Sequence, residues 1–522
     1  MAILTWSITL FVQARANFLD FKYQRYDLGN MVQAVWSTTQ GRLLETTFGT
    51  GEQTSRLAAH VDPILALLAP LWMIAPTPLS LVAVQIAACA LGALPVFWLG
   101  CRHLASERAA ACLALAYLIN PWLAWTALDA MHPSTLAIPL FLFCIWFLDS
   151  NRLVMFSVCA ILAASTTELA GVSIAGLGLW YWASKNRRTG LVIAFAGLAW
   201  TATCLKLIIP AFLGDESQFY SFYTSVGGSP MGVIVKAVTD PGAITDALFT
   251  RGDLAYVVAL SAPLAGAFLL SPLLAAVAIP ALAANSLSSI GGHIDPRGHW
   301  IAGILPFLVA ATVLGLAKLP RRHIAISATF VMALSIGLFV VFGPPVGAPW
   351  LQSFWPNMKP DAGYVTALHD AVELIPDNAS VAATTKAGSH LSARRYFYSV
   401  PVTVSAEWVL IDKRDPWIPF PATGTERTMV GRFDPKLVSA QLARLGQSSN
   451  WRQVFERDGV FVFRRARARA KTVSGSRPPD STARPTARYG QGAIRPRRRR
   501  AGSPRSRSSW LPARTPLRRR AP

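Results

Sequence analysis

The stretch LSLVAVQIAACALGALPVFWL, residues Leu79–Leu99, contains no charged side chain. A predominantly apolar run of roughly 18 or more residues is long enough to cross a lipid bilayer as an α-helix. Other apolar stretches have the same character: Met1–Phe18, Ala109–Leu128, Thr135–Leu148, Leu153–Thr167, Leu169–Ala183, Leu191–Phe212, Leu254–Leu270, Pro272–Ile290, Trp300–Leu316 and Ile324–Phe342. The sequence therefore predicts an α-helical polytopic membrane protein with about 11 transmembrane helices.

The composition supports a membrane protein and gives no support to a specific nucleic-acid binder. The chain has 522 residues, of which 52% are hydrophobic and 15% are charged, whereas soluble domains carry about 25% charged residues. The formal net charge is +22. The segment Arg464–Pro522 accounts for +18 of this charge through its eighteen arginines, and about +4 remains for the rest of the chain. The basic charge thus says little about the folded part.

Three regions follow from these patterns. Residues 1–342 form the predicted transmembrane domain, whose loop 20–62 carries an interfacial helix. Residues 343–465 form a predicted extracytoplasmic α/β domain, because SVAAT, WVLID and GVFVF are typical of short strands and Tyr364, Leu368 and Val372 have helical spacing. A second helix is predicted near Lys436–Leu445. Residues 466–522 are rich in Arg, Pro, Ser and Gly without periodicity, which predicts a disordered tail.

Short basic connections predict the orientation, because cytoplasmic loops are rich in Lys and Arg. These connections are Arg102–Arg108, the turn at Arg152, Lys185–Arg188 and Lys318–His323. If all of them are cytoplasmic, the loop Asp20–Asp62, Asp129 and His132, Glu168, the loop Asp215–Asp253, the stretch His293–Trp300 and everything beyond Gly343 lie outside. Acidic residues and histidines thereby collect on one face, where ionisable groups at membrane depth indicate function.

Asp27 opens the stretch YDLGNMVQAVW, residues Tyr26–Trp36. Leu28, Met31, Val32 and Val35 share one helical face and polar residues share another, which predicts an amphipathic helix lying in the outer membrane interface. Asp27 can serve there as the N-cap of the helix. It can also be a carboxylate held at the mouth of a cavity, and the two roles are compatible.

Three further motifs place histidine beside a carboxylate on the predicted outer face. They are HVDP with His60 and Asp62, DAMHP with Asp129 and His132, and HIDP with His293 and Asp295. Such groups bind a divalent cation or transfer protons, and Asp62 and Asp295 are candidate metal ligands. Capping of helix ends is the alternative for each histidine, and the spacing matches no zincin, zinc-finger or EF-hand pattern.

Glu168 interrupts a long uncharged stretch, so it is expected to be paired or protonated if it is buried. Lys206 and Arg297 are candidate partners of Glu168, or candidate ligands of an anionic lipid head group. Snorkelling towards the interface is the alternative role for Lys206. The chain contains no Walker A, GxGxxG, GxSxG or HExxH motif, which argues against ATP-driven transport and the common soluble enzyme chemistries.

The order of YDLGNMVQAVW, the HVDP stretch that continues to HL at residue 104, MHPS and TTELAGVSIAGLGLWYW resembles a family of prokaryotic membrane proteins catalogued as domain of unknown function 2079. The resemblance covers about Tyr23 to Arg465. Matching positions are Tyr26, Asp27, Gly29, Gln33, His60, Pro63, His132, Pro133 and Glu168. Two positions depart from the family pattern: Ser134 stands where the family often has Glu, and Thr166 lies where a Lys-Glu-Asp triplet is common nearby.

That family is similar in layout to the C-type glycosyltransferases, which use polyprenyl-phosphate sugars as donors. The resemblance implies that Asp27 is the base and that Glu168 is a second catalytic residue. It implies a substrate-binding set of Tyr26, Gln33, His60, Asp129, His132, Lys206, His293 and Arg297. A divalent cation, a membrane lipid and an envelope glycan, lipid or protein acceptor are the implied partners.

The alternatives are a transporter or flippase, in which Glu168 and Lys206 form a pathway, and a non-catalytic envelope protein. Fold-level similarity alone does not decide between them.

Overall fold

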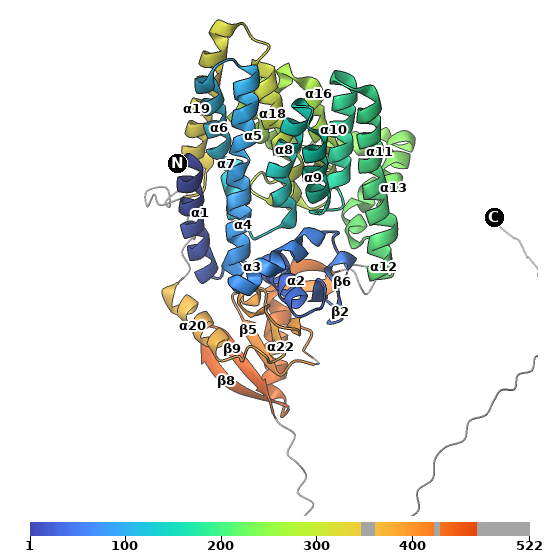
Figure 1. Cartoon of the computed structure of the whole chain (residues 1–522). Coiled ribbons are helices and arrows are strands. Elements are labelled where there is room, and N and C mark those ends of the chain that lie inside the picture. The colour runs from blue at the N-terminus through green and yellow to red at the C-terminus, as the bar shows by residue number, and fades with distance from the viewer. Residues whose placement is uncertain (346–360, 404, 422–428, 467–522) are drawn as a thin grey trace, which may run out of the picture. The chain divides into compact units, whose positions relative to one another are not determined.

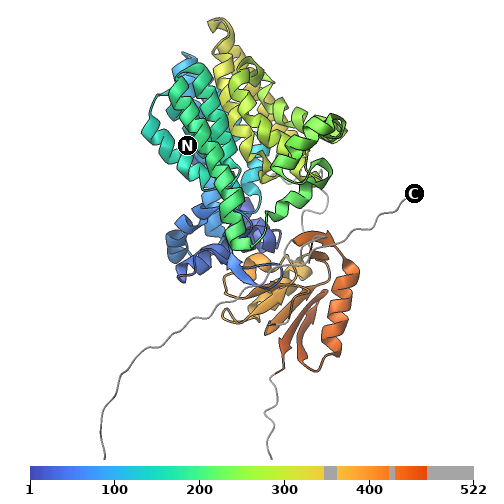
Figure 2. The same ribbon diagram turned by 90° about the vertical axis from the view of Figure 1, so that its right-hand side faces the viewer.

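The computed structural model describes residues 1–345, 361–403, 405–421 and 429–466. The chain divides into two units, Met1–Ala468 and Arg469–Pro522, and the following description concerns the first. Apart from Ala466 itself, the predicted disordered tail lies outside the described residues. A helical bundle fills one end of the first unit and an α/β region the other, as both views show (Figure 1, Figure 2).

The helices of the bundle follow one another with short connections. They are α1 (Ala2–Leu19), α2 (Asn30–Thr39), α3 (Ala69–Ile74), α4 (Pro78–Leu91), α5 (Ala93–His103), α6 (Glu107–Leu118), α7 (Pro121–Leu128), α8 (Ala137–Asp149), α9 (Leu153–Ala164), α10 (Ala170–Ser184), α11 (Arg187–Thr203), α12 (Ile209–Leu213), α13 (Pro230–Thr239), α14 (Pro241–Leu248), α15 (Arg251–Ser261), α16 (Pro272–Ala275), α17 (Ile279–Ser286), α18 (Leu305–Leu316) and α19 (Arg321–Phe342). Every predicted apolar stretch overlaps at least one of these helices. The predicted loop 215–253 is itself largely helical, because it contains α13 and α14.

The number of spans is confirmed only in part. Within the part of the chain that the structure describes, three helical segments are long and apolar enough to cross a membrane: Pro78–His103, Arg187–Leu213 and Arg321–Phe342. The pair α6 and α7 makes a fourth if its 46° bend is counted within one span. Pro121 causes this break, since proline cannot continue the hydrogen bonding of α6. Asn120 restarts the helix by accepting hydrogen bonds from the Trp122 and Leu123 amides at 3.0 and 3.4 Å.

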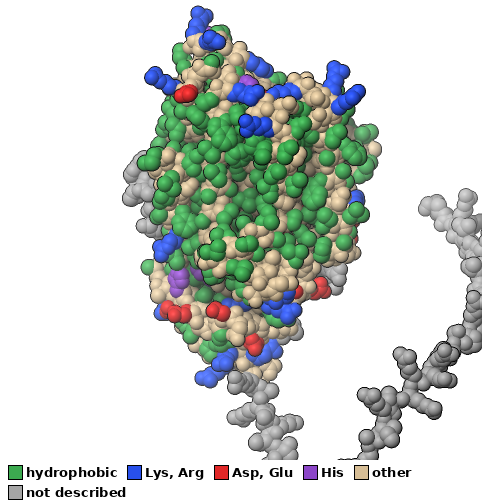
Figure 3. Space-filling model, viewed as in Figure 1, with side chains coloured by type: hydrophobic (Ala, Val, Ile, Leu, Met, Phe, Trp, Pro, Cys, Tyr) green, Lys and Arg blue, Asp and Glu red, His purple; other side chains and the backbone are tan. Residues whose placement is uncertain are grey.

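The outer surface of the bundle is apolar. Large hydrophobic side chains are exposed on α9, α11 and α19, including Val154, Phe195 and Ile326. Figure 3 shows hydrophobic side chains across the middle of one face, with lysines and arginines gathered above them. A surface this apolar is unfavourable in water, and it is the surface expected of helices that face lipid tails.

Asp149 joins three helix ends at the basic end of the bundle. Its carboxylate receives Arg102 Nε at 3.0 Å, His103 Nε2 at 2.9 Å and Lys185 Nζ at 3.0 Å. Arg102 and His103 end α5, Asp149 ends α8, and Lys185 follows α10. The basic connections Arg102–Arg108, Arg152 and Lys185–Arg188 therefore lie at the same end of the bundle, as their charge pattern predicted.

The C-terminal region is a mixed α/β fold, as predicted. Its helices are α20 (Ala362–Glu373), α21 (Gly388–Leu391) and α22 (Pro435–Gln447), and its strands are β3 (Val381–Ala383), β4 (Phe397–Ser399), β5 (Trp408–Asp412), β6 (Trp417–Pro421), β7 (Met429–Phe433), β8 (Trp451–Arg457) and β9 (Val460–Arg465). Five strands form a sheet in the order β4-β3-β5-β9-β8. β3 is parallel to β4 and β5, and β9 is antiparallel to β5 and β8. The predicted strands SVAAT, WVLID and GVFVF correspond to β3, β5 and β9.

Alternating side chains place an apolar layer on each face of this sheet. Leu410 and Val462 pack with Leu368 of α20 on one face. Val409 and Phe463 pack with Val438 of α22 on the other. The sheet is thus covered by one helix on each side, and this accounts for the buried pattern of β5.

The first loop is clamped to the C-terminal region. Arg25 is buried, and its guanidinium donates to the carbonyls of Thr47 and Phe397 at 2.7 and 3.0 Å and to Ser399 Oγ at 3.0 Å. The Tyr26 hydroxyl bonds to Ser399 Oγ at 3.0 Å. Burial lowers the pKa of Arg25 to about 10. The chain immediately around Asp27 is therefore fixed by residues far away in the sequence.

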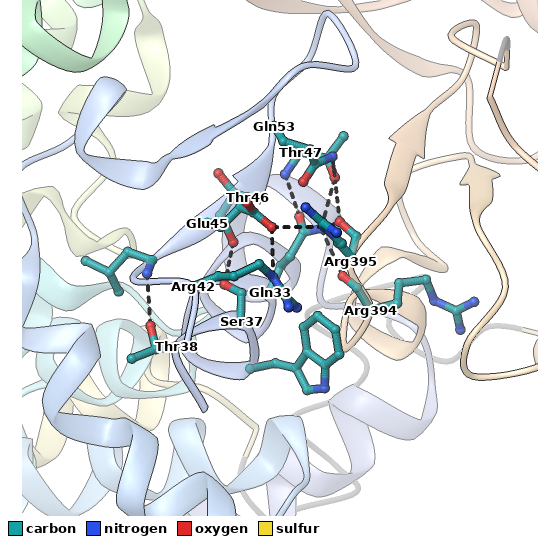
Figure 4. A network of polar contacts seen from close by, with 12 residues as sticks. Gln33, Ser37, Thr38, Arg42, Glu45, Thr46, Thr47, Gln53, Arg394 and Arg395 are labelled. Carbon is teal, nitrogen blue, oxygen red and sulfur yellow. Dashed lines mark hydrogen bonds and ion pairs between the residues drawn. The ribbon is translucent and has the colours of Figure 1, made fainter. Parts of the chain in front are cut away.

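Gln33 is the second clamp (Figure 4). Its Oε1 accepts a hydrogen bond from the Thr47 amide at 3.0 Å, and its Nε2 donates to Thr47 Oγ1, Arg394 O and Arg395 O at 3.0 to 3.1 Å. Thr47 belongs to β1 (Glu45–Thr47), which pairs antiparallel with β2 (Gln53–Ser55). Both faces of α2 are therefore buried in protein, and the position of this helix in the outer membrane interface stays a prediction.

Candidate functional site

A cavity of about 270 Å³ lies where the first loop, α8, α10, α17 and the start of η11 (His299–Gly303) meet. Two groups of ionisable side chains border it. The first group is called the histidine cluster and consists of Asp27, Asp129, His132 and His299, of which the two histidines line the cavity directly. The second is called the paired group and consists of Arg56, His60, Asp62 and Glu168, all of which line the cavity.

Asp27 lies within η1, a π-helical turn from Arg25 to Gly29. α2 begins with Asn30 and receives no side-chain cap, so the predicted N-cap role of Asp27 is wrong. Its Oδ1 lies 3.3 Å from His132 Nε2, and 42% of the Asp27 side chain remains exposed. π-helical turns are rare and frequent at functional sites. Asp27 is thus an accessible carboxylate held against a histidine of the cavity wall.

His132 contacts Asp27 and also lines the cavity. Its Nδ1–H donates to the Ala130 carbonyl at 2.7 Å, while its Nε2 faces Asp27. Both nitrogens therefore carry a proton when both contacts are hydrogen bonds to oxygen. Burial alone would lower the pKa of His132, but the hydrogen bond and charge of Asp27 and the charge of Asp129 raise it above its ordinary value.

Asp129 and His299 complete the histidine cluster. The rings of His132 and His299 stack with centroids 3.5 Å apart. Asp129 Oδ1 accepts a hydrogen bond from the Ala130 amide at 2.8 Å, and its Oδ2 lies 3.4 Å from His299 Nδ1 and 3.9 Å from His132 Nδ1. Burial and the neighbouring charge of His132 lower the pKa of His299 to about 4. One imidazole of the stack is therefore neutral near neutral pH.

Gln85, in the middle of α4, holds the backbone of this loop. Its Nε2 donates to the carbonyls of Thr126, Ala127 and Asp129 at 3.0 to 3.3 Å, and its Oε1 accepts from the His132 amide at 2.9 Å. Gln85 is fully buried. A buried amide satisfied at both ends fixes its partners firmly, so the segment from Asp129 to His132 is a rigid part of the site.

In the paired group, Arg56 Nε donates to Asp62 Oδ2 at 2.8 Å, with both side chains buried. Asp62 Oδ1 is buried with no hydrogen-bond partner among the described residues. Burial raises the pKa of Asp62 despite the charge of Arg56. Arg56 precedes the HVDP motif on η2 (Arg56–Ala58), whose first turn is capped by the Ser55 side chain.

His60 and Glu168 form the other pair. His60 Nδ1 lies 3.1 Å from Glu168 Oε1, and the Val61 amide donates to Glu168 Oε2 at 3.1 Å. Burial alone would raise the pKa of Glu168, but the charge and hydrogen bond of His60 outweigh it and hold the pKa below its ordinary value. Phe219 stacks on the His60 ring at 4.3 Å between centroids. Both oxygens of Glu168 are occupied, so Glu168 orients His60.

Several predicted site residues lie away from the cavity or are otherwise engaged. Lys206 is exposed and pairs with Glu216 at 2.8 Å, so the predicted pairing with Glu168 is wrong. Arg297 pairs with Asp295 at 2.6 Å beside a different pocket, and it does not contact Glu168 either. His293 is buried against Trp300 at 3.8 Å between ring centroids.

Asp62 and Asp295 are each bound to an arginine and line different pockets, so they do not form one metal site, and metal binding by either stays a prediction. Tyr26 and Gln33 bond to the C-terminal region, and their substrate contacts stay a prediction. The structure does bring together the other predicted residues, Asp27, Asp129 and His132 in one cluster and His60, Asp62 and Glu168 in the other.

Sequence reasoning missed Arg56, Gln85 and His299. The sequence did carry a signal for Gln85, because its amide lies within the apolar stretch Leu79–Leu99, where it needs a buried hydrogen-bond partner. His299 was part of the HIDPRGHW stretch. In that stretch His293 and Arg297 were predicted to be site residues instead, because they lie in or next to the His-Asp-Pro motif.

The helical bundle with its apolar outer surface and the α/β region that follows it define a predicted membrane protein. The chain belongs to the predicted membrane protein family DUF2079, whose sequence model matches residues 18–462. The family resemblance drawn from the motifs is thereby confirmed. No curated protein sequence matches the chain.

Solved structures with similar folds include ArnT from Cupriavidus metallidurans bound to undecaprenyl phosphate. The match has a TM-score of 0.51 and 11% sequence identity, and it covers 88% of this chain and 97% of ArnT. The apo state of the same ArnT matches with a TM-score of 0.43 and 12% identity, over 89% of this chain and 98% of ArnT. The first of these likenesses establishes a shared fold.

Proposed function

We propose that this protein is an inverting membrane glycosyltransferase that transfers a sugar from a polyprenyl-phosphate donor to an envelope acceptor on the outer face of the cell membrane. The observation that carries the proposal is the 270 Å³ cavity, lined by Arg56, His60, His132 and Glu168 and next to Asp27. It occurs in a fold shared with ArnT, which was solved with undecaprenyl phosphate. The acceptor is an envelope glycan, lipid or protein.

Asp27 is the proposed base. A hydroxyl of the acceptor attacks the anomeric carbon, its proton passes to Asp27, and the bond from that carbon to the phosphate oxygen breaks with its electron pair leaving on the polyprenyl phosphate. His132 holds one carboxylate oxygen of Asp27 at 3.3 Å, and the exposed part of the side chain is open to an acceptor. Attack opposite the leaving group inverts the anomeric carbon.

Arg56 is the proposed partner of the leaving phosphate, in place of the predicted Lys206 and Arg297. Its Nε is engaged by Asp62, whereas no other side-chain bond of its guanidinium is found among the described residues. The two remaining nitrogens can therefore bind phosphate oxygens, for which the planar guanidinium is well suited. A positive charge there stabilises the negative charge that develops on the leaving group.

Glu168 is a positioning residue. It fixes the Nδ1 side of His60, so that the Nε2 side of the same ring is left for the cavity. Nε2 of His60 can then form a hydrogen bond with a sugar hydroxyl.

The outer location rests on charge placement. Arg102, His103 and Lys185 meet at Asp149 at the end of the bundle that carries the basic connections. The positive-inside rule places that end in the cytoplasm, which puts the cavity and the α/β region outside. The shorter apolar helices, such as α8, α9 and α18, cross the bilayer together with the three long ones, giving about 11 spans in total.

The test is release of polyprenyl phosphate by purified protein in lipid, with a panel of polyprenyl-phosphate sugars and envelope acceptors. The variant Asp27→Asn removes the base and keeps the shape of the side chain. Asp20→Asn is the matched control, because Asp20 lies in the same loop and pairs with Lys22 at 3.2 Å. We expect release by the wild type and the control and a loss of about 10²–10⁴-fold in Asp27→Asn.

Release that is equal in the wild type and Asp27→Asn would remove Asp27 from the mechanism. No release from any donor would contradict the transferase and favour a transporter, a flippase or a non-catalytic envelope protein. Labelling of the α/β region from the cytoplasmic side would contradict the proposed orientation.

A further inference from the structure

Asp129, His132 and His299 each bring one potential metal-ligand atom to the same place. The carboxylate oxygen and the ring nitrogens all lie within 4.8 Å of one another, and this is the one such group of three found among the described residues. Asp129 Oδ2 lies 3.4 Å from His299 Nδ1 and 3.9 Å from His132 Nδ1. Ligands about 2.0–2.2 Å from a tetrahedral zinc ion lie about 3.3–3.6 Å apart, so a small inward movement would let them share one cation.

The surroundings of the three residues support ligation. Metal-bound histidines usually donate their other ring N–H to a carboxylate, which fixes the ring. His132 has this arrangement, because its Nε2 faces Asp27 Oδ1 at 3.3 Å while its Nδ1 faces Asp129. In the described geometry the Nδ1–H of His132 donates to the Ala130 carbonyl, and a cation would take the place of that proton.

The backbone that carries these ligands is held from outside the cluster. The Ala130 amide occupies Asp129 Oδ1, which turns Oδ2 towards the histidines. Gln85 ties the Asp129 carbonyl to the His132 amide. Thr126 bonds to the Gly298 carbonyl at 3.1 Å, next to His299. A preformed set of ligands on a fixed backbone is what metal affinity requires.

The donor set indicates the class of cation. Two imidazoles and one carboxylate suit zinc and similar first-row transition ions, whereas Mg²⁺ and Ca²⁺ prefer oxygen ligands. Three protein ligands leave a fourth tetrahedral position for a water or a substrate oxygen, as in catalytic zinc sites. His132 and His299 line the cavity, so that position is next to it.

We propose that Asp129, His132 and His299 bind one divalent transition-metal cation of the zinc class at the cavity wall, with Asp27 orienting His132. These residues differ from Asp62 and Asp295, the candidate metal ligands expected from the sequence. If the proposed transferase function holds, the cation lies beside the leaving phosphate and complements Arg56 in stabilising its charge.

The test measures metal binding directly and needs no sugar donor. The full-length protein in detergent, with any affinity tag removed, is treated with a chelator and dialysed. Zn²⁺ is then titrated by calorimetry, metal content is measured by mass spectrometry, and Co²⁺ is added separately to record its visible d–d absorption. The variants are Asp129→Asn, His299→Gln and Asp27→Asn. His323→Gln is the control, because His323 is exposed on α19 and lies outside the cluster.

We expect a single equivalent of Zn²⁺ and an intense tetrahedral Co²⁺ spectrum in the wild type and in His323→Gln, and loss of both in Asp129→Asn and His299→Gln. Asp27→Asn should keep the single equivalent and the spectrum with an affinity about 10–100-fold lower. Asp27 is half-exposed, so this variant is expected to fold. It therefore still tests the proposal if the other two variants fail to fold.

An unchanged affinity in Asp27→Asn would remove Asp27 from its orienting role, whereas undiminished Zn²⁺ binding in both Asp129→Asn and His299→Gln would overturn the metal site. So would a wild-type protein that binds no Zn²⁺ but transfers sugar in the presence of a chelator, a result that leaves the transferase intact. Specific Zn²⁺ binding without any sugar transfer would support the metal site and contradict the transferase.

Discussion

Replacing Gln33 tests whether the first loop is clamped to the C-terminal region. Gln33 is buried and makes four hydrogen bonds, one through Oε1 and three through Nε2. Methionine has a similar length and shape but makes none of them. Glutamate keeps an acceptor for the Thr47 amide but brings a carboxylate oxygen against Thr47 Oγ1, Arg394 O and Arg395 O.

The hydrogen bonds that each variant loses determine the size of its loss in stability. Gln33→Met leaves the buried Thr47 amide and the Arg394 carbonyl without this partner, at about 1–3 kcal/mol each. The Arg395 carbonyl keeps the Thr47 hydroxyl at 3.2 Å. Burial of the apolar methionine side chain returns about 1.5–3 kcal/mol, so we expect a net loss of about 1–3 kcal/mol. Gln33→Glu buries an uncompensated charge and should lose about 3–5 kcal/mol.

The assay is thermal unfolding in detergent at one fixed scan rate, because unfolding of such a protein is expected to be irreversible. Limited proteolysis of the first loop gives a local readout. Gln40→Met and Gln40→Glu are the matched controls, since Gln40 ends the same helix and is exposed. We expect the order wild type, Gln33→Met, Gln33→Glu in falling stability, with both Gln40 variants at the wild-type value.

A Gln33→Glu variant as stable as the wild type would refute the clamp. It would return Gln33 to the substrate-binding role that the sequence suggested, in which a carboxylate facing sugar hydroxyls is tolerated. A loss of stability of the same size in the Gln40 variants would instead point to a general effect on α2.

The helices and strands could be predicted because their signals are local. Each apolar stretch satisfies its own backbone hydrogen bonds as a helix, so the run of side chains is sufficient evidence. The alternation in WVLID and GVFVF is likewise local and predicted β5 and β9. The number of spans could not be settled this way, because breaks such as the one at Asn120 and Pro121 depend on single residues within an apolar run.

The environment of α2 could not be predicted because it depends on contacts across more than three hundred residues of sequence. The alternation of Leu28, Met31 and Val32 with Asn30 and Gln33 predicted two faces correctly. Nothing in the stretch distinguishes a polar face that meets water from one that meets the backbone of Arg394 and Arg395. A surface helix and a helix between two packed regions have the same pattern.

Residue types predicted which residues lie at the site better than they predicted which of these residues pair with one another. Histidine and carboxylate beside proline at helix ends pointed to His60, Asp62, Asp129 and His132, and all of these lie at or next to the cavity. Their pairings were not predictable, because Arg56 is nearer to Asp62 than any residue the motifs suggested. Lys206 and Arg297 were expected at the site because they are cations, yet each is neutralised locally by Glu216 and Asp295.

Three further predictions follow from the buried polar groups. Arg56→Met should lower stability by about 3–5 kcal/mol, because it leaves the buried carboxyl group of Asp62 without its partner, and the added change Asp62→Leu should restore most of it. Thermal unfolding of the single and double variants in detergent measures both, and a double variant no more stable than Arg56→Met would contradict the pairing. Gln85→Leu should leave helical circular dichroism unchanged but weaken Zn²⁺ binding by about 10–100-fold, since the loop that carries Asp129 and His132 loses its anchor; an unchanged affinity in the same calorimetric titration would contradict that anchor. The third prediction concerns pH. The pKa of Glu168 is lower in the folded protein than its ordinary value, so the pair with His60 contributes stability above the ordinary glutamate pKa of about 4.3 and loses it as the pH falls through the folded pKa. Glu168→Gln cannot titrate, so its unfolding midpoint should fall less steeply than that of the wild type between about pH 5 and pH 3. Glu107→Gln is the control, because Glu107 lies in the first turn of α6 and is exposed, and it should keep the wild-type slope. Identical acid slopes in the wild type and Glu168→Gln would mean that Glu168 is already protonated in the folded state, and His60 would then have no fixed carboxylate to orient it.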